Sequence, residues 1–75
     1  MLVVDMAATG RNIVALRDRN KKTVKDIQDV FGFATPQAIY KWQNGTALPT
    51  IDNLVILAMI FNVTIDDIII TNVVA

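Results

Sequence analysis

The sequence contains no cysteine, no histidine, no serine and no glutamate. Without cysteine there is no disulfide framework and no thiolate metal site, and without histidine the usual zinc ligand and the usual general base are missing. Threonine hydroxyls, aspartates, lysines and one tyrosine remain, a poor set for nucleophilic or acid–base chemistry at neutral pH. We therefore do not expect an enzyme, and we expect no cofactor, catalytic residue, metal or small-molecule substrate.

Long apolar runs are also lacking. The longest covers residues 54–61, far short of the roughly 20 residues that a membrane span needs. The first residues lack the basic leader and apolar stretch of a secretory signal, so we expect a cytoplasmic protein with no membrane partner. The chain is nevertheless 53% hydrophobic over 75 residues, which indicates one small folded domain.

The zero net charge hides an asymmetry between the two parts of the chain. Residues 1–45 hold all seven basic side chains and four aspartates, a net charge of +3, whereas residues 46–75 hold only three aspartates, a net charge of −3. One end is basic and the other is acidic, which permits a polyanion-binding face without requiring one.

Helix start and stop signals recur through the chain and predict an all-α, compact five-helix domain over residues 9–70, preceded by an extended arm (1–8) and followed by a tail (71–75). The first helix follows Thr9-Gly10 and ends near Asn20. The β-branched residues at both ends of the chain permit a short antiparallel pairing of the termini. Expected N-caps are Thr23, Thr35, Thr50 and Thr64, and expected C-terminal glycines are Gly32 and Gly45.

The second and third expected helices form a helix-turn-helix over about residues 23–44. In the second helix, Val24, Ile27 and Phe31 form an inward stripe, so that Lys25, Gln28 and Asp29 face away. In the third, Ile39 and Trp42 point inward, which favours a core role for the tryptophan over a stacking platform.

An ordered series of short motifs resembles the Cro/C1-type helix-turn-helix family of bacterial and phage regulators. The series is Trp42-Gln43-Asn44-Gly45, then Leu48-Pro49, Asn53-Leu54 and Phe61-Asn62-Val63. The resemblance implies a lambda-repressor-like fold that binds double-stranded DNA as a dimer. Residues that match DNA-contacting positions of the family are Thr23, Lys25, Thr35, Gln37, Ala38, Tyr40, Lys41, Asn44 and Thr46.

Gln37 is the best candidate for a base contact, because its carboxamide can pair bidentately with adenine. Other residues have alternative roles. Thr35 and Asn44-Gly45 suit helix caps, the lysines suit ordinary solvated charges, and Asp66-Asp67 suit the positive end of a helix better than a metal site.

The chain departs from the family pattern in four places, one of which is Val24, where a polar residue often reaches a phosphate. The corner between the second and third helices is one residue longer than in many members. Lys21-Lys22 replace a glycine and an apolar residue, and Gln43 replaces a glutamate that typically pairs with the arginine retained here as Arg17. We therefore expect Arg17 to meet the neutral amide of Gln43.

The C-terminal half has more apolar residues than one small core needs, which indicates self-association. Ile56 and Met59 are expected to form a second stripe on the fourth helix, opposite its inward stripe. The alternative is that terminal strands cover this stripe within one chain. The predicted homodimer interface is Ile56, Met59, Ile70, Val73 and Val74.

We therefore expect a transcriptional regulator that represses by occupying an operator as a dimer. The alternative is a protein-interaction module of the same fold, such as an antitoxin or an anti-repressor, in which DNA binding is secondary or lost.

Overall fold

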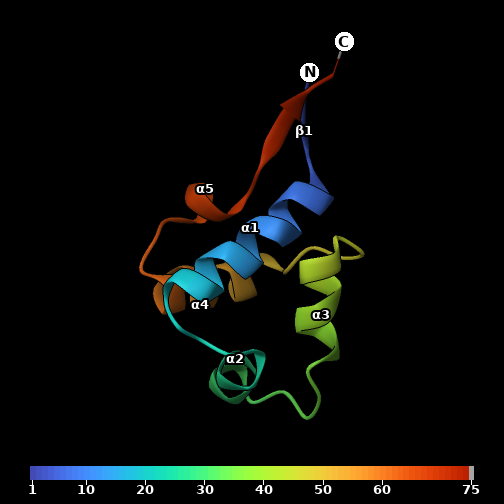
Figure 1. Cartoon of the computed structure of the whole chain (residues 1–75). Helices are drawn as coiled ribbons and strands as arrows, with labels where there is room; N and C mark the ends of the chain where they lie inside the picture. Colours follow the sequence, from blue (N-terminus) through green and yellow to red (C-terminus); the bar gives the residue numbers. More distant parts are fainter. Residues whose placement is uncertain (75) are drawn as a thin grey trace.

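The computed structural model describes residues 1–74 and shows five helices between two short strands (Figure 1). The elements are β1 (Leu2–Val4), α1 (Met6–Arg19), α2 (Val24–Phe31), α3 (Gln37–Asn44), α4 (Ile51–Phe61), α5 (Ile65–Ile68) and β2 (Thr71–Val73). The all-α fold class is confirmed, and so is the antiparallel pairing of the two ends of the chain. Among the described residues, no helix is long and apolar enough to span a bilayer.

Threonine caps start three of the helices where the sequence predicts them. Thr23 forms a capping box, in which its Oγ1 accepts from the Asp26 amide at 3.0 Å and the Asp26 carboxylate accepts from the Thr23 amide at 2.8 Å. The Thr23 backbone amide donates a hydrogen bond to the Asp26 carboxylate, and this bond holds the pKa of Asp26 below its ordinary value. Thr64 forms a second capping box, with Asp67, at the start of α5, whereas Thr50 caps α4 through its Oγ1 alone, which accepts from the Asn53 amide.

Two predicted helix starts are wrong. α1 begins at Met6, because Asp5 accepts from the Ala8 amide at 2.9 Å and acts as the N-cap. Residues 6–8 are therefore helical and do not belong to an extended arm. In α3 the N-cap is Pro36, which makes no side-chain cap bond, so Thr35 does not cap this helix.

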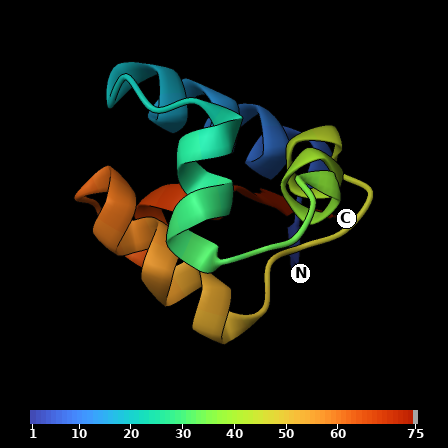
Figure 2. The ribbon, with the colours of Figure 1, turned by 90° about the horizontal axis from the view of Figure 1, so that it is seen from below.

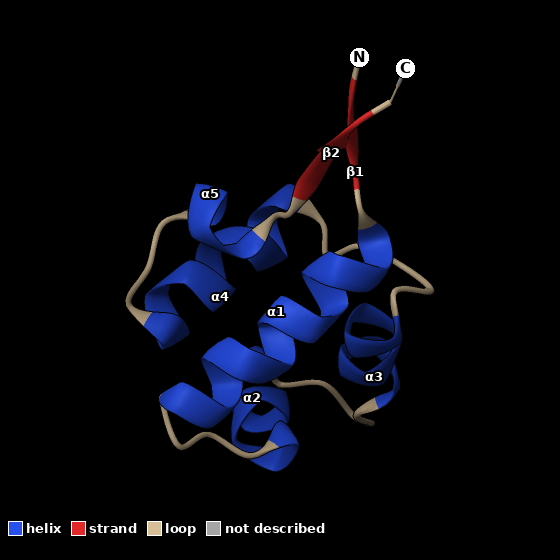
Figure 3. Cartoon of the chain, turned by 45° about the horizontal axis from the view of Figure 1, so that its top comes forward, coloured by secondary structure: helices blue, strands red, loops and turns tan. Residues whose placement is uncertain are grey.

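α1 crosses the middle of the helical part of the molecule (Figure 3), and buried residues from all five helices form the core. Trp42 is buried in it, as predicted, together with Ile39 on the same side of α3. α1 and α3 approach closely at Gly10, where an added Cβ would lie 2.4 Å from the carbonyl oxygen of Gln43. The core residues are Ile13, Leu16, Ile27, Ile39, Trp42, Leu54, Leu57, Phe61 and Ile68.

The two strands form an antiparallel ribbon that projects from the helices (Figure 1). Its base is fixed to α1 by Thr9, a fully buried residue whose Oγ1 accepts from the Ile70 amide at 2.9 Å. Asn12 donates to the carbonyl oxygens of Asp67 and Ile68 at 2.7 and 3.0 Å. Part of the expected 71–75 tail is thus a strand, and Ala75 lies outside the described residues.

Candidate nucleic-acid interface

α2 and α3 cross steeply, joined by the corner at residues 32–36 (Figure 2). Gly32 ends α2 with a φ of +70°, in the left-handed region that glycine adopts without strain. The corner lies at the end of the molecule opposite the terminal strands (Figure 1). This is the helix-turn-helix arrangement that the sequence predicts for about residues 23–44.

The corner is held by an aromatic cluster and one side-chain hydrogen bond. The rings of Phe31 and Phe33 stack with centroids 4.9 Å apart, and both meet Trp42 edge-on. Gln28 donates from Nε2 to the carbonyl oxygen of Phe33 at 3.1 Å. Gln28 is half-buried, so the expectation that it faces away is wrong. The position of Gln28 in the α2 sequence does not show whether its side-chain amide bonds across the corner or faces solvent.

α3 presents a polar outer face at helical spacing. Gln37, Tyr40, Lys41 and Asn44 stand at i, i+3, i+4 and i+7, and all four are exposed. The helix contains no acidic residue. Four of the predicted contact residues therefore share one accessible surface, with donors, acceptors and one cation.

The other predicted residues lie around this outer face. Thr35 is exposed in the corner, and Thr46 is exposed after α3, where its amide donates to the Lys41 carbonyl at 3.0 Å. Ala38 is half-buried and packs against the core. Thr23 is exposed at the start of α2, where its Oγ1 accepts from the Asp26 amide.

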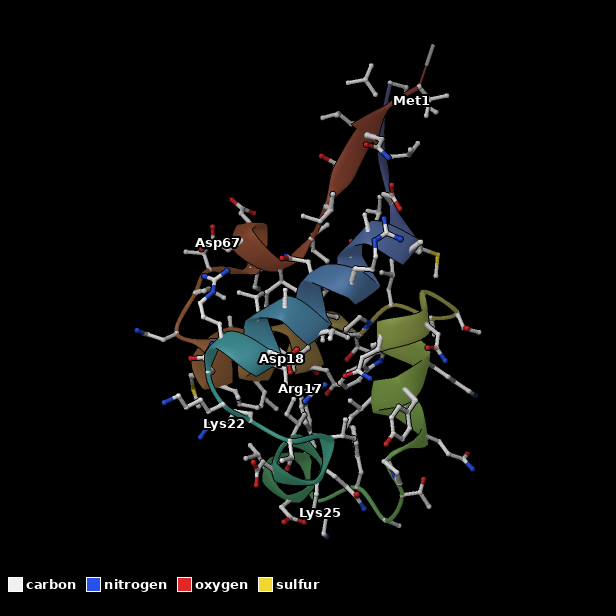
Figure 4. The ribbon with its side chains drawn as sticks, viewed as in Figure 1. Met1, Arg17, Asp18, Lys22, Lys25 and Asp67 are labelled. Carbon is white, nitrogen blue, oxygen red and sulfur yellow. The ribbon has the colours of Figure 1, made fainter. Side chains whose placement is uncertain are left out.

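Lys25 is exposed, and its ammonium lies 2.8 Å from the Asp29 carboxylate. In Figure 4 Lys25 lies below α2, on the same side of the molecule as the corner. Exposed pairs at this spacing contribute about 0.3–0.5 kcal/mol. The pair is therefore weak enough for Lys25 to exchange Asp29 for a phosphate.

Arg17 bonds to Gln43 on α3, as predicted, and it also bonds to the turn between α1 and α2. Its Nε donates to Oε1 of Gln43 at 3.1 Å and its Nη1 donates to the Lys22 carbonyl at 2.9 Å. Asp18 lies 3.4 Å from the guanidinium and supplies the carboxylate that α3 lacks. Figure 4 shows Arg17 on the side of α1 that faces α2.

The end of α3 is fixed by Gly45, which has a φ of +73° and terminates the helix. An added Cβ at Gly45 would lie 2.8 Å from the Cα of Ala7 in the first turn of α1. The predicted cap at Asn44-Gly45 is confirmed.

The helix-turn-helix family model HTH_3, of the Cro/C1 type, matches residues 13–68. The chain belongs to this helix-turn-helix family. Its members are DNA-binding regulators of transcription. No curated protein and no solved structure matches the chain.

The residues of the predicted dimer interface lie in two separate places, on α4 and at the terminal strands. On α4 the exposed stripe is Ile51, Val55 and Met59, whereas Ile56 is half-buried; the predicted pairing of Ile56 with Met59 in one exposed stripe is therefore wrong. The terminal strands do not cover Met59, which is 75% exposed.

The C-terminal members of the predicted dimer interface lie at the strands. Val73 and Val74 are exposed there, and Ile70 is half-buried at the base, where its backbone bonds to Thr9.

Proposed function

We propose that this protein binds duplex DNA sequence-specifically, with the outer face of α3 in the major groove, and represses transcription in the cytoplasm by occupying an operator as two copies. The observation that carries this proposal is the exposed, acid-free set of Gln37, Tyr40, Lys41 and Asn44, presented by a corner that side chains hold in place. A helix of this kind fits the major groove, which is about 12 Å wide.

Base reading falls to Gln37, in the first turn of α3. Its exposed carboxamide can donate to and accept from one adenine in a single plane. A selection from random duplexes, repeated with Gln37→Ala, tests this role. The variant should lose about 1–3 kcal/mol at one base-pair position and tolerate other bases there. An unchanged selected sequence would refute the role of Gln37.

Phosphate contact falls to residues around that face, including Thr23, Lys25, Thr35 and Thr46. Lys25 and Asp29 provide a matched pair of variants, because they bond to each other on the exposed side of α2. Lys25→Ala should weaken all duplexes alike and reduce the slope of log affinity against log salt by about one. Asp29→Asn should strengthen all duplexes, since it removes a charge that competes with phosphate for the same lysine.

The rival function is a protein-interaction module of the same fold. The exposed apolar stripe Ile51, Val55 and Met59 on α4 favours it, as does the zero net charge of the chain. Titration of labelled random duplexes at two salt concentrations separates the two functions. Duplex binding that weakens with salt supports the DNA-binding regulator. A lack of duplex binding even at low salt would refute it and support the protein-interaction module.

A further inference from the structure

The terminal ribbon, residues 1–4 and 71–74, is an apolar structure standing away from the helices (Figures 1 and 3). Leu2 is 67% exposed and Val73 is 78% exposed. None of its side chains is charged. A two-stranded ribbon is marginally stable in water and normally gains further strands or a packed face.

The register of the ribbon shows which backbone groups are free. Met1 and Val74 exchange hydrogen bonds of 2.8 and 3.1 Å, and the Asp5 amide donates to the Ile70 carbonyl at 2.8 Å. Bonded and non-bonded pairs alternate in an antiparallel ladder, so Val3 and Asn72 form the bonded pair between these two.

The intervening pairs are Leu2 with Val73 and Val4 with Thr71. Their amides and carbonyls point outward, to the two open edges of the ribbon. The β1 edge therefore offers the backbone groups of Leu2 and Val4, and the β2 edge offers those of Thr71 and Val73.

The ribbon is fixed at its base, so its edges are presented in a defined orientation. Asn72 donates to the Asp5 carboxylate, which also caps α1. Thr9 bonds to both the amide and the carbonyl of Ile70. These bonds hold the base of the two strands in a fixed position relative to α1.

We propose that a second copy of this chain docks on the β1 edge, with the two β1 strands antiparallel about a two-fold axis at Val3. In this register Leu2 of each copy opposes Val4 of the other and the two residues exchange both backbone bonds, giving four hydrogen bonds across the axis. The result is a four-stranded sheet with the order β2-β1-β1-β2. The inference rests on the two-copy form of the proposed function, but it is testable without DNA.

Three observations favour a second copy as the occupant. The edge is complementary to itself. Its outward backbone groups belong to Leu2 and Val4, on either side of Val3, so an antiparallel copy centred on Val3 places Leu2 opposite Val4 and Val4 opposite Leu2. Side chains that natural edge strands use against self-pairing, lysine and proline above all, are missing from residues 1–4. The lack of basic side chains on these residues disfavours nucleic acid as the occupant.

The β1 edge is favoured over the β2 edge by its side chains. Leu2 and Val4 are both apolar and both exposed, and the dimer would place them beside each other on one face of the sheet. On the β2 edge, Val73 would meet Thr71, which contributes less apolar surface.

Sedimentation equilibrium of the full chain, up to roughly 0.5 mM, tests the proposal, a range that covers weak specific association. The wild-type chain should dimerise. Leu2→Pro should weaken the dimer at least tenfold, because proline removes an outward amide from the β1 edge and leaves the internal ladder intact. Val73→Pro, the matched change on the β2 edge, and Met59→Lys, on the α4 stripe, should leave the dimer unchanged.

A second variant and a direct readout guard against misfolding of the proline variants. Leu2→Lys keeps every backbone bond and should also weaken the dimer, whereas Val30→Lys, at an exposed valine on α2, should not. In a mixed-isotope sample, Leu2 of one copy should show nuclear Overhauser contacts to Val4 of the other.

The outcomes separate this inference from the proposed function. A monomer at all concentrations, or a dimer abolished by Met59→Lys or Val73→Pro but not by Leu2→Pro, overturns ribbon pairing even if duplex DNA is bound. Ribbon-paired dimers that bind no duplex DNA support the pairing and overturn the proposed function.

Discussion

Replacing Gly10 with alanine distinguishes helix propensity from helix packing in this fold. Gly10 lies inside α1, where alanine is intrinsically better by about 1 kcal/mol. Propensity alone therefore predicts a more stable protein. The added Cβ, however, would lie 2.4 Å from the Gln43 carbonyl oxygen and 2.6 Å from that of Trp42.

Both of those atoms are backbone atoms of α3, so a side-chain rotation cannot relieve the contact. An ordinary carbon–oxygen contact needs more than 3 Å, and α1 and α3 must separate to provide it. Overpacking of this kind costs about 1–3 kcal/mol, and loosening a rigid helix contact places it at the upper end. We expect Gly10→Ala to lower the free energy of unfolding by about 2 kcal/mol after the propensity gain, a large share of the 3–5 kcal/mol that one small core typically provides.

Urea denaturation followed by the fluorescence of the buried Trp42 measures this change. Gly32→Ala is the matched control. Gly32 also has a conformation that restricts substitution, with a φ of +70°, but no atom lies within 4 Å of an added Cβ. It should lose only about 1 kcal/mol from backbone strain. A Gly10→Ala protein that is more stable than wild type would show that the two helices are not held at this distance.

Three further predictions concern other contacts. Thr9→Val should cost about 1–3 kcal/mol in urea denaturation, because the amide of Ile70 loses its buried acceptor. Lys21→Gly should stabilise by about 0.5–1 kcal/mol, since Lys21 has a φ of +55°, whereas Lys22→Gly should not. Because the folded-state pKa of Asp26 is lowered, stability present above about pH 4 should decline as the pH falls further, and Asp26→Asn should reduce that decline in acid titrations.

Local signals predict most of the helices because each acts within one turn of chain. Thr23 and Thr64 need only the amide three residues ahead, and Gly45 needs only its own backbone freedom. The start of α1 was not predicted by these signals. The apolar periodicity begins only at Ile13, whereas Asp5 caps the helix about two turns earlier. Thr35 failed as a cap because the five-residue corner places Pro36 at the N-cap instead.

The exposed side of α4 could not be predicted from its sequence. The helix is apolar on nearly every side, so the spacing of its apolar residues does not show which side faces the core. The packing of neighbouring helices decides which residues stay exposed. That packing buries Leu54 and Leu57 and leaves Val55 exposed in place of Ile56. The outer face of α3 was predictable for the opposite reason, since Ile39 and Trp42 are the only large apolar residues that define its inward side.

Gln43, at a position where the Cro/C1-type pattern commonly has glutamate, has an electrostatic consequence for α3. A carboxylate there would pair more strongly with Arg17 than the amide does, and it would stabilise the junction of α1 with α3. It would also place the only negative charge on a helix whose single cation is Lys41. In a chain with no net charge, keeping that helix free of acid preserves the local potential that attracts phosphate. Asp18, on α1, supplies the countercharge of Arg17 from outside the proposed DNA-facing surface.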